Sequence, residues 1–248
     1  MKISIITATY NSEASILSAI KSVAVQDYLN VELVIIDGGS SDNTVSIIKD
    51  NYNRPLKIIS EKDKGIYDAL NKGIKHATGD IIGLVHSDDF FASPDVISEV
   101  VTAFQQNDVD GVYGDLQYVN KEDTSKVIRY WKSEQFYPGL LKKGWMPAHP
   151  TLFLRKEVYD KHGLFNLNYR IAADYDLMLR IFRDSALKFY YLPRVITKMR
   201  VGGASNRSLA NIRQKSAEDL LALKANGIKN PYKVLARKNL SKLKQFLK

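Results

Sequence analysis

The first half of the chain alternates apolar runs of strand length with segments in which apolar residues recur every three to four positions. This alternation restricts the fold more than any other feature. Strands joined by helices form mostly parallel sheets with helices on both faces, so we expect an α/β protein. The expected strands are residues 2–9, 31–37, 56–60, 80–86 and 109–118. The expected helices are residues 12–26, a segment capped by Ser41 or Asp42, residues 65–77 and residues 94–106.

The second half carries weaker periodic patterns. Further strands are expected at residues 127–131, 150–154, 189–192 and 195–199, and a helix at residues 173–183. The pattern of residues 208–248 is helical, with a break near Gly227 and a restart at Pro231.

Composition excludes several classes of protein. The chain has 248 residues, of which 45% are hydrophobic, and no cysteine, which excludes disulfides and thiolate metal sites. It lacks a P-loop and the glycine fingerprint of dinucleotide-binding proteins, which argues against an NTPase and a Rossmann oxidoreductase. No stretch approaches the roughly 20 apolar residues of a spanning helix. We therefore expect a cytoplasmic protein, or one attached to a membrane from that side.

The net charge of +9 is concentrated at the C-terminus. Residues 206–248 hold 11 Lys or Arg and 2 Asp or Glu, which leaves 25 charges of each sign in the rest of the chain. This segment is interpreted either as an interfacial helix on anionic lipid or as a terminal helix that packs its apolar stripe on the body. A nucleic-acid partner is not expected, because no binding motif accompanies the charge. The stripe at helical spacing is Ala236, Leu240, Leu243 and Leu247.

Polar clusters follow four of the expected strands, where α/β sheets bind their ligands. We expect these clusters to line one rim of the sheet. The cluster after the second strand, residues 37–44, is either a phosphate-binding turn at a helix N-terminus or an ordinary turn with a cap. The four clusters are residues 9–11, 37–42, 61–65 and 86–89.

Asp88 and Asp89 are adjacent carboxylates at the end of a strand. They are either a solvated pair or ligands for Mg²⁺ or Mn²⁺, which shares its remaining sites with water and substrate phosphates. The position on the rim favours the cation. His149, between Pro147 and Pro150, is either structural or a further ligand, and imidazole suits Mn²⁺ better than Mg²⁺.

Asp174 and Asp176 lie at the start of the helix expected at residues 173–183. Acidic residues in a first turn are favoured by the helix dipole, which is one interpretation of both. The other interpretation is that one of them acts as a general base. Residues two apart on a helix point in different directions, so at most one faces the cleft. Asp174 lies closer to the preceding loop and is the candidate.

In order and spacing, these motifs resemble family 2 glycosyltransferases, the inverting nucleotide-sugar enzymes of the GT-A fold. The resemblance covers roughly residues 1–205, and the motif at residues 63–73 is similar to a branch found in bacterial O-antigen and capsule clusters. The matching stretches are residues 4–11, 34–44, 61–73, 79–89 and 173–177.

The resemblance implies roles for residues on the rim. Asp89 would be the main ligand of Mn²⁺ or Mg²⁺ with Asp88 beside it, and Asp174 would be the catalytic base. The base position is often preceded by an acid in this family, whereas here Ala173 precedes it. The implied diphosphate loop contains Gly202, Gly203 and Ser205. The implied nucleotide-binding residues are Thr9, Tyr10, Asn11, Asp37 (on uracil), Asp63, Lys64 and Asp88.

The resemblance also implies an activity and a division of the chain. Residues 1–118 would bind the nucleotide sugar, residues 119–205 would bind the acceptor and supply the base, and residues 206–248 would form a basic helical extension. The reaction would transfer glucose, galactose or N-acetylglucosamine from UDP, with inversion to a β-linkage. The expected acceptor is a saccharide on undecaprenyl diphosphate, met at the inner membrane face. The alternatives are a metal-dependent phosphatase and a non-enzymatic, basic-tailed protein that binds membrane or a partner.

Overall fold

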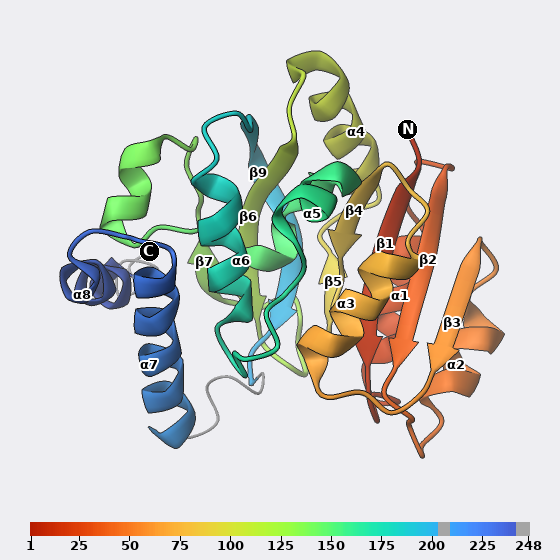
Figure 1. The fold of residues 1–248 in the computed structure, drawn as a ribbon. Helices are drawn as coiled ribbons and strands as arrows, with labels where there is room; N and C mark the ends of the chain where they lie inside the picture. Colours follow the sequence, from red (N-terminus) through yellow and green to blue (C-terminus); the bar gives the residue numbers. More distant parts are fainter. Residues whose placement is uncertain (203–208, 242–248) are drawn as a thin grey trace.

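The computed structural model describes residues 1–202 and 209–241 and contains one curved, nine-stranded sheet (Figure 1). Strands β1 to β4 are parallel to one another, whereas β8 is antiparallel to both of its neighbours, β4 and β6. Strand β7 (Val127–Trp131) pairs with β6 off the main path. The main order is β3 (Leu56–Ser60), β2 (Val31–Asp37), β1 (Ile3–Thr9), β4 (Ile81–Leu84), β8 (Phe153–Arg155), β6 (Gly111–Val119), β9 (Phe189–Arg200) and β5 (Asp89–Phe91).

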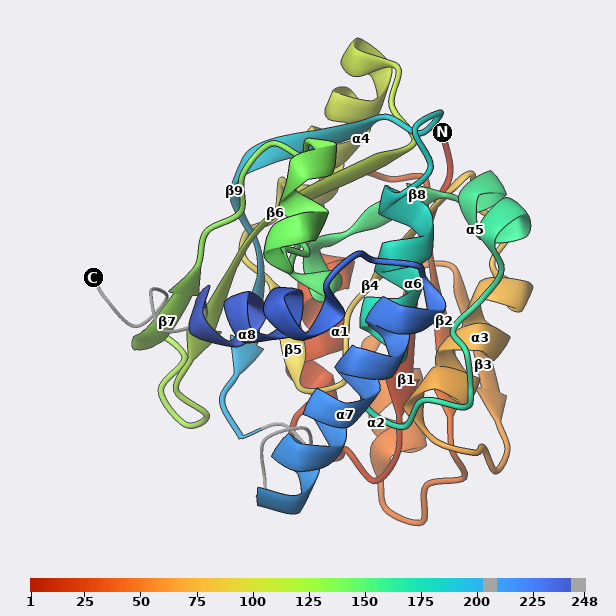
Figure 2. The same cartoon turned by 60° about the vertical axis from the view of Figure 1, so that its left-hand side comes forward.

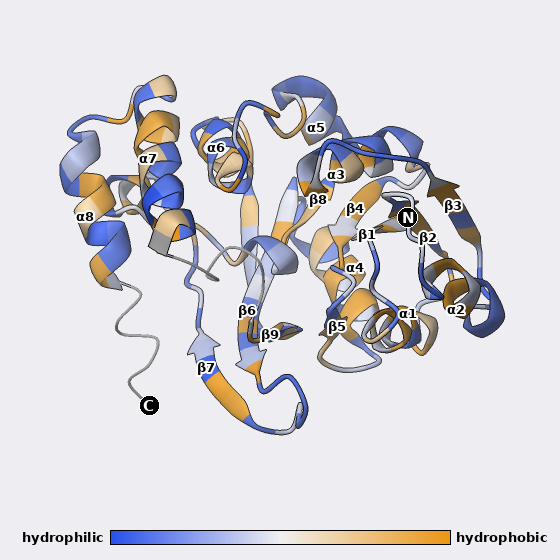
Figure 3. Ribbon diagram, turned by 90° about the horizontal axis from the view of Figure 1, so that it is seen from below, coloured by the Kyte–Doolittle hydropathy of each residue, from blue (hydrophilic) through white to orange (hydrophobic). Residues whose placement is uncertain are grey.

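Helices cover both faces of the sheet, as expected for parallel strands buried on both sides (Figure 3). On β1, Ile3 and Ile5 point into one apolar cluster, and Ile6 and Ala8 point into the other. The first face is covered by α1 (Ile16–Ala24), α2 (Thr44–Asn51) and α4 (Val96–Asn107). The second is covered by α3 (Ile66–His76), α5 (Lys156–His162) and α6 (Ala173–Phe182).

The C-terminal helices α7 (Leu209–Ala225) and α8 (Pro231–Ser241) lie outside α6, on the side away from the sheet (Figure 2). The expected break occurs at Gly227, whose φ of 62° suits glycine. Two 3₁₀ segments, η1 (Pro138–Lys143) and η2 (His149–Thr151), precede β8, and α8 contacts η1. Within the described ranges, no helix has both the length and the apolar composition that crossing a membrane requires.

The α/β fold with a mostly parallel first half is confirmed, and the differences lie mainly in the second half. The two strands expected at 189–192 and 195–199 are one strand, β9, whose register against β6 shifts near Asp115. The strand expected at 150–154 starts only at Phe153, because η2 occupies the preceding residues. The first helix starts at Ile16 rather than at Ser12. The short elements β5 and α5 were not expected from the sequence.

Candidate functional site at the carboxyl edge of the sheet

The loops after β1 and β2 are joined by hydrogen bonds. The backbone N–H of Asn11 donates to Ser40 Oγ at 2.8 Å, and the N–H of Ser41 donates to Asn11 Oδ1 at 2.9 Å. Asn11 has a positive φ of 46°, which asparagine tolerates better than most residues. Ser12 continues the connection by donating its N–H to Thr44 Oγ1 at 2.8 Å. The predicted nucleotide residue Asn11 therefore lies where two rim loops meet.

Asp37 is fully buried at the end of β2 and organises the loop that follows it. Its carboxylate accepts hydrogen bonds from Ser60 Oγ at 2.6 Å, from the backbone N–H of Ser40 at 3.0 Å, and from Ser40 Oγ. The carboxylate therefore has several partners within the protein, and its contact with uracil stays a prediction. Thr9 pairs with Asp37 across the strands, and its buried hydroxyl has no partner among the described atoms.

Tyr10 and Asp63 meet at Gly38. A Cβ placed on Gly38 would lie 2.7 Å from Asp63 Oδ2 and 3.4 Å from the Tyr10 ring, so any larger residue would displace the Asp63 carboxylate. Tyr10 is 63% exposed, which leaves its ring open to stack on a planar group. Lys64 is exposed, and its backbone N–H donates to Asp68 Oδ2 at 3.1 Å at the start of α3. The structure therefore brings Tyr10 and Asp63 together at the rim.

The loop after β4 is joined to the β1 loop, because Ser12 Oγ donates to Ser87 Oγ at 3.0 Å. The neighbouring carboxylates have different environments. Asp89 begins β5 and is 1% exposed, and neither carboxylate oxygen has a hydrogen-bond partner among the described atoms. Asp88 is half-buried, and its backbone carbonyl accepts a hydrogen bond from Arg200 Nη1 at 2.6 Å. Burial raises the pKa of Asp89 well above its usual value, Asp88 raises it further, and Arg200 partly opposes both.

A buried, unpartnered carboxylate is costly and is stabilised by a bound cation. The surroundings of Asp89 therefore fit a divalent cation. No group of three or more acids and histidines suited to a metal occurs among the residues that the structure describes. A cation here would take one or two carboxylates and complete its shell with water and substrate oxygens, which is the usual arrangement for Mg²⁺.

Two histidines, His86 and His149, lie side by side with ring centroids 6.1 Å apart. Burial lowers the pKa of His149 to about 4, while nearby Asp174 opposes this shift. Burial also lowers the pKa of His86, whereas the nearby Asp88 and Asp174 act to raise it. Both rings are therefore neutral near pH 7. Asp174 is the acidic neighbour that acts on the pKa of His149. The assignment of His149 as a metal ligand stays a prediction.

The N-terminal turn of α6 separates the two candidate bases. Asp176 is buried and paired, since it accepts from Arg180 Nε at 3.0 Å and from Asn226 Nδ2 at 2.9 Å. Asp174 instead influences the pKa of both histidines, and Tyr67 Oη lies 3.4 Å from its Oδ1. Asp174, from the second half of the chain, thus lies in the same electrostatic environment as Asp88 and Asp89.

The expected diphosphate loop follows β9 and Arg200. Gly202 has a φ of 104°, which only glycine adopts readily. Gly203 and Ser205 lie outside the described residues.

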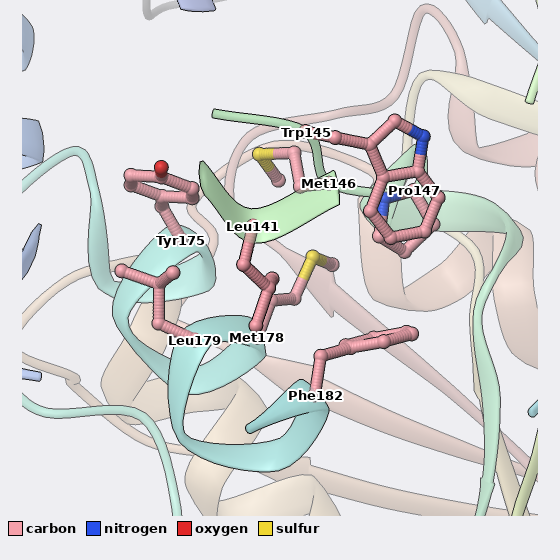
Figure 4. A pocket seen from close by; sticks show the side chains of 8 residues that line it. All are labelled: Leu141, Trp145, Met146, Pro147, Tyr175, Met178, Leu179 and Phe182. Carbon is pink, nitrogen blue, oxygen red and sulfur yellow. The ribbon is translucent and has the colours of Figure 1, made fainter. Parts of the chain in front are cut away.

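An apolar pocket between η1 and α6 lies next to this site but contains no carboxylate or histidine (Figure 4). The side chains of α6 and of the chain after η1 face one another across it, which suits packing better than reaction. It is lined by Leu141, Trp145, Met146, Pro147, Tyr175, Met178, Leu179 and Phe182.

The glycosyl transferase family 2 model matches residues 4–163, more than half of the chain. The chain belongs to glycosyl transferase family 2. It is therefore a glycosyltransferase, and the alternatives of a phosphatase and a non-enzymatic adaptor are set aside. A PGL/p-HBAD biosynthesis glycosyltransferase of Mycobacterium bovis is 32% identical over 208 residues, which cover 82% of this chain and 78% of that protein. An uncharacterized glycosyltransferase of Haemophilus influenzae is 30% identical over 226 residues, or 86% of this chain and 69% of that protein.

Solved structures confirm the GT-A fold of this family 2 enzyme. S. aureus TarS 1–349, in complex with UDP-GlcNAc, matches with a TM-score of 0.70 at 18% identity, over 96% of this chain and 72% of that chain. The mannosyltransferase PcManGT from Pyrobaculum calidifontis, in complex with GDP-Man and Mn²⁺, matches with a TM-score of 0.65 at 19% identity, over 96% and 68% of the two chains.

Proposed function

We propose that the protein transfers a hexose from a UDP-sugar to a hydroxyl group of a saccharide acceptor with inversion of the anomeric centre. In this proposal residues 1–118 bind the donor, residues 119–205 bind the acceptor and supply the base, and residues 206–248 are an extension. Glucose, galactose and N-acetylglucosamine are the candidate sugars. An α-linked donor gives a β-linked product, because a single displacement inverts the centre.

One observation carries the proposal: an unpartnered buried carboxylate, Asp89, and an acid from the other half of the chain, Asp174, share one electrostatic environment. Both act on the pKa of Tyr118, and Asp174 also acts on that of His86. A donor diphosphate held near Asp88 and Asp89 places its sugar on the side of Asp174. Asp174 then takes the proton of the acceptor hydroxyl as that oxygen attacks the anomeric carbon.

Asp89 and Asp88 would hold Mn²⁺ or Mg²⁺, whose charge offsets the negative charge of the leaving diphosphate. The backbone of the pair is held by Arg200, a cation next to the expected diphosphate loop. Tyr10 would stack on the base, with Asp63 and Lys64 near base or ribose and Asn11 at the nucleotide. His149 would face the reacting sugars beside Asp174 or contribute to the metal.

The structural neighbours support a nucleotide-sugar donor, and TarS supports the choice of UDP. TarS was solved with UDP and with UDP-GlcNAc, and PcManGT with GDP-Man and Mn²⁺. As acceptor we propose a saccharide carried on undecaprenyl diphosphate in O-antigen, capsule or exopolysaccharide synthesis. An enzyme acting on such a lipid works at the inner face of the membrane, where the basic C-terminal helix meets anionic lipid.

Two matched variants test the assignment of roles. Asp89→Asn should abolish the Mn²⁺-dependent part of UDP binding in calorimetry, because the buried carboxylate charge is lost. Asp174→Asn should bind UDP and Mn²⁺ like the parent protein, yet lose at least about 10²-fold in turnover, since removal of a general base costs roughly that much. Turnover is measured as UDP released from each candidate donor, with and without a chelator.

Three results would contradict the proposal. Near-normal transfer by Asp174→Asn would show that Asp174 is not the catalytic base. Full activity in the presence of a chelator would show that the reaction needs no metal ion. If the enzyme turned over only GDP-mannose, the donor would not be a UDP-sugar.

A further inference from the structure

The C-terminal extension contains two acidic residues, Glu218 and Asp219, among 11 basic ones. Both lie on α7, and both are buried, at 8% and 1% exposure. Acidic side chains in a basic, mostly exposed segment are usually stabilised by solvent or by ion pairs at the surface. Their burial points to specific partners on the body of the enzyme.

Glu218 accepts three backbone hydrogen bonds from the segment just before α6. Its Oε2 accepts from the N–H of Ile171 at 2.7 Å and from that of Ala172 at 2.9 Å, and its Oε1 accepts from that of Arg170 at 3.2 Å. Oε1 also accepts from Gln214 Nε2 at 2.9 Å. Burial tends to raise the pKa of Glu218, but these hydrogen bonds outweigh it and lower the pKa overall. The carboxylate is therefore charged at neutral pH.

These donors lie at the N-terminus of the helix that carries the proposed base. Ala172 is the N-cap residue of α6, and its side chain makes no capping hydrogen bond. Glu218 instead accepts from the N–H of the cap residue itself and of the two residues before it, and places a negative charge at the positive end of the helix. Asp174 lies two residues beyond this cap, so the orientation of the first turn determines where its carboxylate points.

The same helix, α7, is fixed to the body at two further points. Lys238 Nζ of α8 lies 2.7 Å from Asp219 Oδ1, with both side chains almost fully buried, and 3.2 Å from the centre of the Tyr175 ring of α6. Near the end of α7, Asn226 donates to Asp176. Helices α6, α7 and α8 therefore form one interlocked unit (Figure 2).

We propose that Glu218 is a positioning residue for the transfer reaction: its carboxylate fixes residues 170–172 and thereby aims Asp174. The inference rests on the proposed role of Asp174. It makes the C-terminal extension part of the catalytic apparatus, in addition to any role in membrane attachment. Small errors in the placement of a reacting group cost large factors in rate, so a cap far from the substrate affects turnover.

The test compares Glu218→Ala with Glu218→Gln in steady-state kinetics on the full chain. Alanine removes both acceptor oxygens and with them all three backbone hydrogen bonds, and kcat should fall about 10²-fold. Glutamine keeps one acceptor oxygen, which serves Ile171 and Ala172, and kcat should fall about tenfold or less. The donor KM and the affinity for UDP with Mn²⁺ should stay within about twofold, because Asp88 and Asp89 are untouched. Glu157→Ala, an exposed acid on α5, is the matched control and should keep parent kcat.

Unchanged kcat in folded Glu218→Ala would overturn the inference, as would an equal loss of kcat and of UDP affinity, which indicates general destabilisation. Where the alanine variant does not fold, Glu218→Gln decides by the same criteria. A failure of the inference is distinct from a failure of the proposed base. Transfer lost in Asp174→Asn but kept in both Glu218 variants overturns only the positioning role, whereas transfer kept in Asp174→Asn overturns the base itself.

Discussion

Tyr67 is a second side chain that holds the segment before α6, through the carbonyl of Ile171 where Glu218 binds its N–H. Its hydroxyl donates to the carbonyl of Ile171 at 2.6 Å and lies 3.4 Å from Asp174 Oδ1. Burial and the nearby Asp174 charge both raise the pKa of Tyr67, so the hydroxyl remains protonated and a donor. Tyr67→Phe should lower kcat about tenfold, the kinetic equivalent of one lost hydrogen bond, at unchanged donor KM.

The control for this prediction is Tyr159→Phe, which removes the hydroxyl of another buried tyrosine, on α5. Initial rates of UDP release across a donor concentration series separate kcat from KM. Equal kcat in parent and Tyr67→Phe would show that Ile171 and Asp174 are held without this hydroxyl.

Positions on the rim were predictable from the sequence, because the end of a strand is a local property of the chain. Asp88, Asp89 and Asp174 all lie at the predicted element ends. Their environments were not predictable. The burial of Asp89 depends on the pairing of β5 with β9, in which Asp89 lies opposite Met199. Tyr67 and its acceptor are 104 positions apart, so no local pattern connects them.

Glu32 joins three neighbouring parts of the parallel sheet at its amino end. It lies on β2 and accepts from Ser4 Oγ of β1 at 2.5 Å, from the N–H of Thr78 before β4 at 2.7 Å, and from Thr78 Oγ1 at 2.8 Å. Lys2 Nζ lies 2.7 Å away. Burial acts to raise the pKa of Glu32, but Lys2 and the hydrogen bonds prevail and lower it to about 2.

This pKa predicts how stability depends on pH. Unfolded Glu32 titrates near 4.5, so its contribution is complete above that pH and is lost as the pH falls towards about 2. A pKa shift of this size corresponds to a contribution of about 3 kcal/mol to the free energy of unfolding. We expect roughly half of that contribution, because Lys2 is partly exposed and solvent screens its charge. In urea unfolding, Glu32→Gln should be less stable than the parent at pH 7, with the difference shrinking towards pH 3. Glu122→Gln, an exposed loop acid, should show no such difference; a gap for Glu32→Gln that is constant with pH would contradict the assignment.

The parallel strands were predictable as elements because each is an uninterrupted apolar run buried on both faces. The second half follows different rules. Strand β9 reads as two strands because Pro193 and Arg194 interrupt the apolar pattern, and the structure continues through them with shifts in register against β6. Strand β5 has three residues and exists only through its pairing with β9. Short strands held by distant partners leave no periodic pattern.

Helix α8 packs on α6 and α7 with one face and exposes the other face to solvent. The stripe was interpreted either as facing lipid or as packing on the body. Its described members, Ala236 and Leu240, are exposed, and Leu243 and Leu247 lie outside the described residues. Helix α8 packs instead through Val234 and Lys238, because Asp219 and the Tyr175 ring provide a site for a buried ammonium group. Packing on the body therefore leaves Ala236 and Leu240 exposed to another partner.

The exposed face of α8 carries large apolar side chains beside cations, as expected for a helix that lies on a membrane surface. Tyr232 and Leu240 are 65% and 64% exposed, and Lys233 and Arg237 are exposed beside them. Changing these four residues together, to Ser at the apolar positions and Glu at the basic ones, leaves Val234 and Lys238 in place. Binding to phosphatidylglycerol vesicles should then fall about tenfold or more, because each cation near an anionic surface contributes about 1 kcal/mol.

Co-sedimentation with anionic and with neutral vesicles measures this binding, and turnover of a water-soluble acceptor analogue monitors the site. Leu29→Ser, which removes an exposed apolar side chain between α1 and β2, should leave both unchanged. Reduced vesicle binding with normal turnover would assign the exposed face of α8 to the membrane and show that this face is not needed for the reaction itself. Equal vesicle binding by the fourfold variant and the parent would refute membrane attachment through this face, because its large apolar side chains, Tyr232 and Leu240, and its cations, Lys233 and Arg237, would all have been removed.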